Sequence, residues 1–232
     1  MPRIKPRELK AAFRVSIPVM MGYMVLGFAF GLLLVSFQYP WYIALLMSIF
    51  IYAGALQFLA IGFFNAKMGL IDIAIASIFV NLRQSFYGLS VLKKFKKTGK
   101  LKPYLIFGLT DETYGLLTTI KEDAQLSSKY YYFYLALLNQ SYWVSGTILG
   151  ALFGSLIEFN TQGLDFSLTA LFVVLAMEQY KNNKNYLPFA IGIFASLIAI
   201  IFVPSNNMLI FSMLCSLIAL LIFRKRLDHV QQ

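Results

Sequence analysis

The chain has 232 residues, of which 59% are hydrophobic and 13% charged, with a formal net charge of +10 and a mean hydropathy of +0.70. A soluble domain carries about 25% charged residues, so this composition indicates a membrane protein. The positive charge lies in short stretches beside apolar segments, as membrane topology and anionic lipids require. This placement argues against nucleic-acid binding, because no folded basic domain is left over for that role.

The apolar segments, in chain order, cover residues 15–37, 41–64, 70–92, 103–120, 130–157, 166–180, 187–203 and 207–223. Most approach the roughly 20 residues that a helix needs to cross the hydrocarbon layer. We therefore predict an all-α fold, a polytopic helical membrane bundle of about 6–8 segments. A single transmembrane transport domain (15–223) then lies between a basic cytoplasmic N-terminus (1–14) and a cytoplasmic tail (224–232).

Clusters of Lys and Arg within residues 3–14, 93–102 and 224–226 flank these segments. The positive-inside rule places all three clusters, and the 181–184 loop, in the cytoplasm. However, three crossings would separate the first cluster from the second and leave the second outside. Two interpretations stay open. Either one segment within 41–92 and one within 103–157 are broken or re-entrant, or the charge rule fails for this loop.

Small or polar residues at 53–55, 81–85, 110–113 and 139–141 are the candidate breaks. Broken helices line the binding sites of transporters near the membrane midplane. We therefore expect polar side chains from these regions to lie along a substrate path: Gln57, Asn81, Gln84, Asn139 and Gln140.

Arg83 and the adjacent Asp111 and Glu112 are ionisable residues inside apolar segments, where charge is costly unless it faces a partner or a water-filled path. Arg83 precedes Lys93 by ten residues and Asp111 follows Lys102 by nine. At about 1.5 Å per helical residue, both lie roughly 14–15 Å from the basic interface. We predict that Arg83 lies close to Asp111 or Glu112. Such a pair either only fixes helix register or also binds substrate or a proton, and we favour the second interpretation.

Glycines spaced four residues apart allow helices to approach closely. Gly27 and Gly31 form one such pair, and Gly146, Gly150 and Gly154 form a longer ridge. These residues predict helix packing, either within the bundle or onto a partner subunit.

Several kinds of chemistry lack the residues that they need. Cys215 is the only cysteine and His229 the only histidine, so we expect no disulfide, metal site or cofactor. No Walker-type phosphate loop occurs, and no nucleophile–base set suggests an enzyme. The lack of a long polar stretch points to a multi-pass protein of a bacterial inner membrane.

Four motifs in order resemble the AzlC family of azaleucine-resistance, branched-chain amino acid permeases. They are Pro18-x3-Gly22-Tyr23-x3-Gly27-x-Ala29-x-Gly31, Ala53-Gly-Ala-Leu-Gln57-Phe58, Asn81-Leu-Arg83 with Tyr87-Gly88, and Thr110-Asp-Glu112. Glu178 in the sixth segment also matches and is added to the expected substrate path. One departure is Gln84, where many relatives have a histidine, and it removes a titratable group beside Arg83.

The resemblance implies export of small apolar amino acids, typically Leu, Ile, Val and sometimes Met. It also implies a partner of about half this size, an AzlD-type helical membrane subunit. The residues suit a zwitterionic substrate, because Arg83 can bind a carboxylate and Asp111 or Glu112 can accept an ammonium group. Either carboxyl is also a candidate to carry a coupling proton. An accessory subunit whose partner forms the transport path is the alternative.

Overall fold

The computed structural model describes residues 5–96, 98–119, 127–156, 186–204 and 208–222, together with Val173, Ala176, Met177 and Tyr180. In these residues the regular structure is entirely helical, as predicted. The predicted segment 166–180 and the loop 181–184 lie almost wholly outside the described residues. The chain divides into one unit of Met1–Ile61 with Asn81–Gln162, and a second of Gly62–Val80 with Gly163–Gln232.

The first helix, α1 (Pro6–Ser36), starts well before the apolar run at residue 15. Pro6 stands in its first turn, where a missing N–H costs nothing, and Glu8 lies near the positive end of the helix dipole. Pro18 is accommodated inside the helix. Among the described helices, α1 alone is both long and apolar enough to cross a membrane by length and composition.

The predicted segment 41–64 is two helices, α2 (Trp41–Phe50) and α3 (Gly54–Asn65). Between them Tyr52 adopts a left-handed backbone conformation with φ 43°, which an L-residue rarely takes. At about 1.5 Å per residue, each half spans roughly half of a hydrocarbon layer about 30 Å thick. The break falls beside the small residues 53–55, as the sequence indicated.

The predicted segment 103–120 is also divided. After η1 (Gly99–Leu101), α5 (Lys102–Phe107) ends before Gly108, and α6 (Asp111–Thr119) begins after Thr110. The Thr113 N–H donates to Thr110 Oγ1 at 3.3 Å, so Thr110 acts as the N-cap of α6. This second break also falls where it was predicted.

The other two predicted breaks are wrong. The helix α4 (Leu70–Phe95) runs through 81–85 without interruption, and α7 (Ser128–Leu156) runs through 139–141. Neither stretch contains Gly or Pro, and Leu, Arg and Gln are good helix formers. Polar side chains alone therefore do not interrupt these helices.

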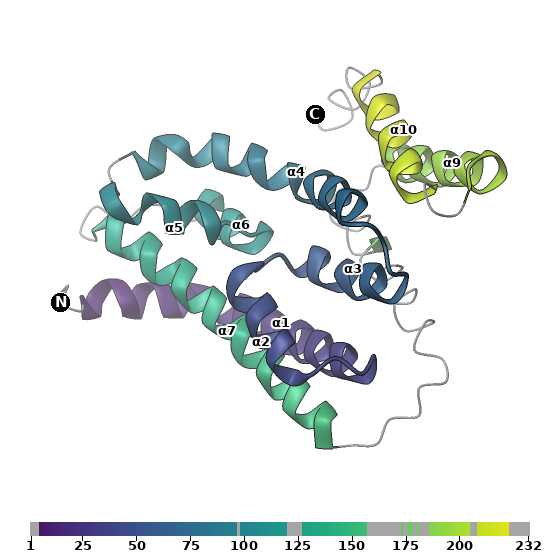
Figure 1. The fold of residues 1–232 in the computed structure, drawn as a ribbon. Coiled ribbons are helices and arrows are strands. Elements are labelled where there is room, and N and C mark those ends of the chain that lie inside the picture. Colours follow the sequence, from purple (N-terminus) through teal and green to yellow (C-terminus); the bar gives the residue numbers. More distant parts are fainter. Residues whose placement is uncertain are drawn as a thin grey trace. The chain divides into compact units, whose positions relative to one another are not determined.

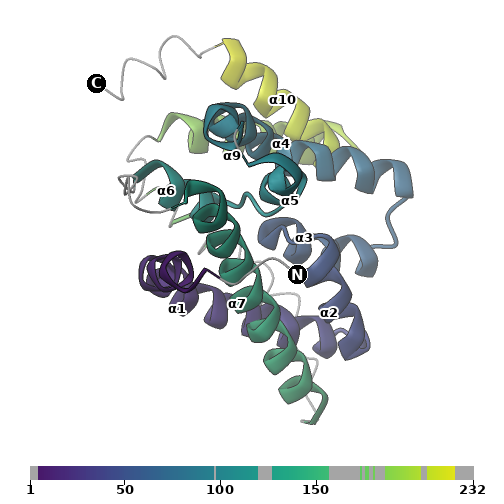
Figure 2. The ribbon, with the colours of Figure 1, turned by 90° about the vertical axis from the view of Figure 1, so that its left-hand side faces the viewer.

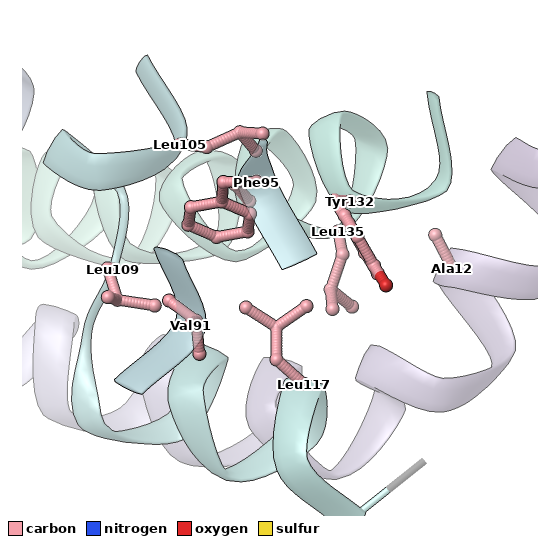
Figure 3. Packing of buried hydrophobic residues seen from close by; sticks show 9 residues of the cluster. Ala12, Val91, Phe95, Leu105, Leu109, Leu117, Tyr132 and Leu135 are labelled. Atoms are coloured by element: carbon pink, nitrogen blue, oxygen red, sulfur yellow. The ribbon is translucent and has the colours of Figure 1, made fainter. Parts of the chain in front are cut away.

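In the first unit, α7 packs along α1 (Figure 1) and also contacts α2, α5 and α6 (Figure 2). A core at one end of this unit gathers side chains from α1, α4, α5, α6 and α7 (Figure 3). Its buried residues are Ala12, Val91, Phe95, Leu105, Leu109, Leu117, Tyr132, Leu135 and Ala136. This core joins the second half of α4 to the two short helices α5 and α6.

In the second unit, α9 (Leu187–Phe202) packs against α10 (Met208–Ile222). Both helices are apolar and shorter than 18 residues. They coincide closely with the predicted segments 187–203 and 207–223.

Polar residues lie inside the described helices while large apolar residues lie outside. Gln57, Asn139, Ser48 and Thr147 are fully buried, whereas side chains such as Met21, Val25, Leu70 and Ile78 are largely exposed. A soluble monomer rarely exposes so much apolar surface, so this exterior fits a membrane protein.

Candidate functional site

An ion pair joins α4 to the start of α6. Arg83 Nη2 lies 2.7 Å from Asp111 Oδ2, and 44% and 36% of the two side chains are exposed. The predicted proximity of Arg83 to an acidic residue is therefore observed, and the partner is Asp111. Asp111 also stands at the N-terminus of α6, where the helix dipole favours a negative charge. Its second oxygen, Oδ1, has no hydrogen-bond partner in the described chain.

Glu112 has a different partner, Tyr23 of α1. The Tyr23 hydroxyl oxygen lies 2.5 Å from Glu112 Oε2 and 2.7 Å from Thr110 Oγ1. Tyr23 is buried, whereas Glu112 is exposed. The adjacent carboxyl groups thus have separate roles in the structure, since Asp111 contacts a cation and Glu112 contacts a neutral hydroxyl.

The polar contacts continue from the start of α6 into α7. Thr110 Oγ1 and Thr113 Oγ1 are 3.1 Å apart, and Asn139 Nδ2 donates to Thr113 Oγ1 at 2.9 Å. The amide oxygen of the fully buried Asn139 has no hydrogen-bond partner among the described residues. A polar network therefore runs from the accessible Glu112 inward to Asn139, at the break between α5 and α6.

A second buried network lies at the break between α2 and α3. Gln57 Oε1 accepts a hydrogen bond from Trp143 Nε1 at 2.9 Å, and Gln57 Nε2 donates to Ser48 Oγ at 3.4 Å. The Trp143 ring packs edge-on against the Tyr23 ring, with 5.4 Å between centroids. Trp143 therefore connects Gln57, beside the break between α2 and α3, with Tyr23, which contacts Thr110 at the break between α5 and α6.

Gln140 joins the same two breaks from α7. Its Oε1 accepts from the Tyr104 hydroxyl of α5 at 2.7 Å, and its Nε2 donates to the Ile49 carbonyl at 3.2 Å. The last carbonyls of a helix lack partners within that helix. Gln140 supplies a donor at the end of α2 and so supports the break.

The remaining predicted path residues are less connected. Asn81 and Gln84 are half-buried on α4, and neither side chain makes a hydrogen bond within the described part of the chain. Glu178 lies outside the described residues.

The predicted packing glycines lie where α1 and α7 meet. A Cβ at Gly27 would lie 2.8 Å from the Trp143 carbonyl oxygen, and one at Gly146 would lie 2.7 Å from that of Met24. Added Cβ atoms at Gly31 and Gly150 would meet the backbones of Thr147 and Phe28 even more closely, whereas the nearest atom to Gly154 is at 3.4 Å. In this unit the ridge is occupied by α1, so Gly146 and Gly150 are not free to dock a partner subunit.

Sequence reasoning did not assign roles to Tyr23, Thr113, Trp143 or Tyr52. Tyr23 entered the sequence comparison only as part of the Gly22-Tyr23-x3-Gly27 motif. A phenol inside an apolar run needs a hydrogen-bond partner when buried, and that requirement was the available signal.

The described residues form only helices, with an apolar exterior, two broken segments and a buried polar network, and these are the features of a helical membrane protein. Comparison with known proteins identifies the group. The AzlC protein family matches residues 18–157, a range that contains the polar network and both helix breaks. This chain belongs to the AzlC family.

Relatives match most of the chain. A Helicobacter pylori membrane protein is 41% identical over 96% of this chain and 97% of its own length. The Bacillus subtilis "Branched-chain amino acid transport protein AzlC" is 36% identical over 96% of this chain and 87% of its own length. The Escherichia coli "Inner membrane protein YgaZ" is 29% identical over 73% and 72%, respectively. No solved structure matches.

Proposed function

We propose that this chain is a secondary transporter of a bacterial inner membrane that exports branched-chain and similar apolar amino acids. The name of the Bacillus relative supports amino acid transport, and the family membership supports a transporter rather than an enzyme. The observation that carries the proposal is the pair of adjacent, differently partnered carboxyl groups, Asp111 and Glu112, at a helix break.

The site suits the two charged groups of an amino acid. Arg83 has five N–H donors and uses one in the observed ion pair, so others can bind a substrate carboxylate. Asp111 Oδ1 is unpartnered and can accept hydrogen bonds from an ammonium group. Both side chains are partly exposed, whereas the Oδ1 atom itself is buried in the described chain, so an ammonium group reaches it only when neighbouring side chains move. One methylene changes binding by only about 1–3 kcal/mol, so a single site tolerates Val, Leu, Ile and Met.

Glu112 is the better candidate for the coupling proton. Asp111 already forms an ion pair with the Arg83 guanidinium. Glu112 instead contacts a neutral hydroxyl and is open to the outside of the described chain. A proton can therefore reach Glu112 without first breaking an ion pair.

The helix breaks support the topology with cytoplasmic termini and a cytoplasmic 93–102 loop. If α2 and α3 together form a re-entrant pair, only α1 and α4 cross before this loop, and the positive-inside rule is obeyed. The pair α5 and α6 would act in the same way on the other side of the loop. Half-length helices that meet at polar residues are the arrangement by which transporters build sites near the midplane.

A small AzlD-type helical subunit completes the proposal. Efflux of preloaded, isotopically labelled leucine from cells producing this chain, with and without that subunit, tests the function. We expect efflux to require this chain and to rise when the subunit is present. Efflux of equal rate from cells that produce the small subunit alone would instead make this chain an accessory component.

A further inference from the structure

We propose that Tyr23 couples the protonation of Glu112 to the start of α6, by donating its hydroxyl proton to either Glu112 or Thr110. The inference rests on the proposed function, in which Glu112 takes up a proton. It assigns a positioning role to a residue of α1 that carries no charge itself.

Two hydrogen-bond acceptors lie within reach of the Tyr23 hydroxyl. The hydroxyl oxygen is 2.5 Å from Glu112 Oε2 and 2.7 Å from Thr110 Oγ1, and both distances are those of good O–H···O hydrogen bonds. A phenol has a single proton to donate. It can therefore serve only one of these two acceptors at a time.

The charge on Glu112 determines whether the Tyr23 hydroxyl donates to Glu112 or to Thr110. An ionised carboxylate only accepts, so the Tyr23 O–H points to it in the stronger, charge-assisted bond. When Glu112 binds a proton from water, its charge changes from −1 to 0 and its O–H can donate to the Tyr23 oxygen. The Tyr23 proton is then free to turn to Thr110 Oγ1.

Thr110 connects this choice to the helix break. Its Oγ1 also accepts from the Thr113 N–H as the N-cap of α6 and lies 3.1 Å from Thr113 Oγ1. An added donor at Thr110 changes the hydrogen bonding of the first turn of α6 and, through Thr113, of Asn139 on α7. The protonation of Glu112 thus changes the hydrogen bonding of Asn139, a fully buried side chain on another helix.

Tyr23 is held too firmly to follow Glu112 itself. Its backbone carbonyl would lie 3.0 Å from a Cβ at Gly146, and its ring packs edge-on against Trp143. The helices α1 and α7 therefore fix the hydroxyl position. We expect the rearrangement on protonation at the first turn of α6, which follows the break, because Leu117 further along this helix is held in the buried core.

Other titratable groups face Glu112 from the surrounding elements. Asp111 is its neighbour on α6, and Arg83 of α4 neutralises that neighbour. Tyr52, in the break between α2 and α3, interacts electrostatically with both Glu112 and Tyr23. The residue of α7 in this network, Asn139, does not titrate. Among the described residues, Tyr23 is the group that hydrogen-bonds to the Glu112 carboxyl.

Infrared difference spectroscopy of the purified chain in lipid vesicles tests the proposal without requiring transport. The protonated carboxyl C=O band that Glu112→Gln removes is titrated with pH in each variant. In Tyr23→Phe the ionised form of the Glu112 carboxyl loses its hydrogen-bond donor, so Glu112 should keep its proton to higher pH. We expect the midpoint of the band to move by about one pH unit toward alkaline pH.

Thr110→Val should act in the opposite direction. It removes the acceptor that Tyr23 needs when Glu112 is protonated, so the midpoint should move to acid pH by about half a unit. Tyr142→Phe is the matched control, because its hydroxyl also joins α7 to α1, at Ser16, but does not contact Glu112. The amide band of the same spectra reports whether each variant keeps its helices.

Unchanged midpoints in both Tyr23→Phe and Thr110→Val would overturn the proposal, as would shifts of the same sign in both. The absence of any band that depends on Glu112 would also overturn it. The expected shifts in a chain that moves no leucine would leave this inference standing and contradict the proposed function instead.

Discussion

Arg83 on α4 and Asp111 at the start of α6 form an ion pair with 2.7 Å between Nη2 and Oδ2, while Glu112, the next residue, hydrogen-bonds to Tyr23 on α1. Two adjacent carboxyl groups are thereby given different environments. Because they are about 100° apart around the helix axis, one faces a cation and the other a neutral hydroxyl. This division of roles underlies the proposed binding of substrate and proton.

Breaking the ion pair should abolish transport. Arg83→Ala leaves Asp111 without its cation and removes the proposed carboxylate ligand, so leucine efflux should fall at least about tenfold, equivalent to 1.4 kcal/mol. The exchanged variant Arg83→Asp with Asp111→Arg should restore the amount of protein in the membrane. Full efflux from Arg83→Ala, at normal membrane abundance, would show that the pair has no part in transport.

The contact between α1 and α7 should tolerate no side chain at its tightest point. Gly150→Ala places a Cβ against the Phe28 backbone, so we expect a loss of about 1–3 kcal/mol or more. Gly22→Ala is the matched control in the same pair of helices, because nothing lies within 4 Å of the added Cβ. Thermal unfolding in detergent should give a lower midpoint for the first variant only. Equal midpoints would mean that the two helices are not in backbone contact.

The bond from Trp143 to Gln57 should stabilise the break between α2 and α3. Trp143→Phe leaves the fully buried Gln57 Oε1 without its donor, a change that costs about 1–3 kcal/mol. Trp41→Phe is the control, because Trp41 is 42% exposed and its loss should have little effect. Chemical or thermal unfolding measures the loss of stability in each of the two variants. A larger loss from Trp41→Phe would refute this account of the break.

The helices could be predicted from the sequence more readily than the site. Long apolar runs with few charges fixed the positions of α4, α7, α9 and α10 to within a few residues, because burial of backbone groups in lipid demands helices. The breaks at Tyr52 and at Thr110 were predictable from small or capping residues. The polar stretches 81–85 and 139–141 suggested breaks that the structure does not have, because polar side chains can project from an intact helix.

The ion pair between Arg83 and Asp111 could be anticipated from depth alone, because both residues are about equally far from the basic loop. The contact between Tyr23 and Glu112 could not. It depends on how closely α1 approaches α7, which Gly27 and Gly146 determine together, and on the angle at which α6 leaves the break. Pairwise packing of this kind is not encoded in the pattern of one segment.

The proposed topology predicts which loops thiol reagents can reach. Single cysteines in the 93–102 loop, the 181–184 loop and each terminus, in a chain with Cys215 replaced by Ser, should react only with a membrane-permeant reagent. The physical reason is the retention of Lys- and Arg-rich loops in the cytoplasm. Labelling of the 93–102 loop by an impermeant reagent from outside would reject the re-entrant arrangement of the broken helices.

The central claim is that a proton gradient alone, acting through Glu112, drives this chain to export apolar amino acids. Its most direct test uses the purified chain, with and without the proposed small subunit, in sealed lipid vesicles that contain labelled leucine and no ATP. We predict that an imposed pH gradient accelerates leucine movement, that a protonophore removes the acceleration, and that Glu112→Gln lacks it while Asp72→Asn retains it. The account would be contradicted if the rate of leucine movement in the wild-type chain did not change with the pH gradient. It would also be contradicted if Glu112→Gln responded to the gradient as the wild type does.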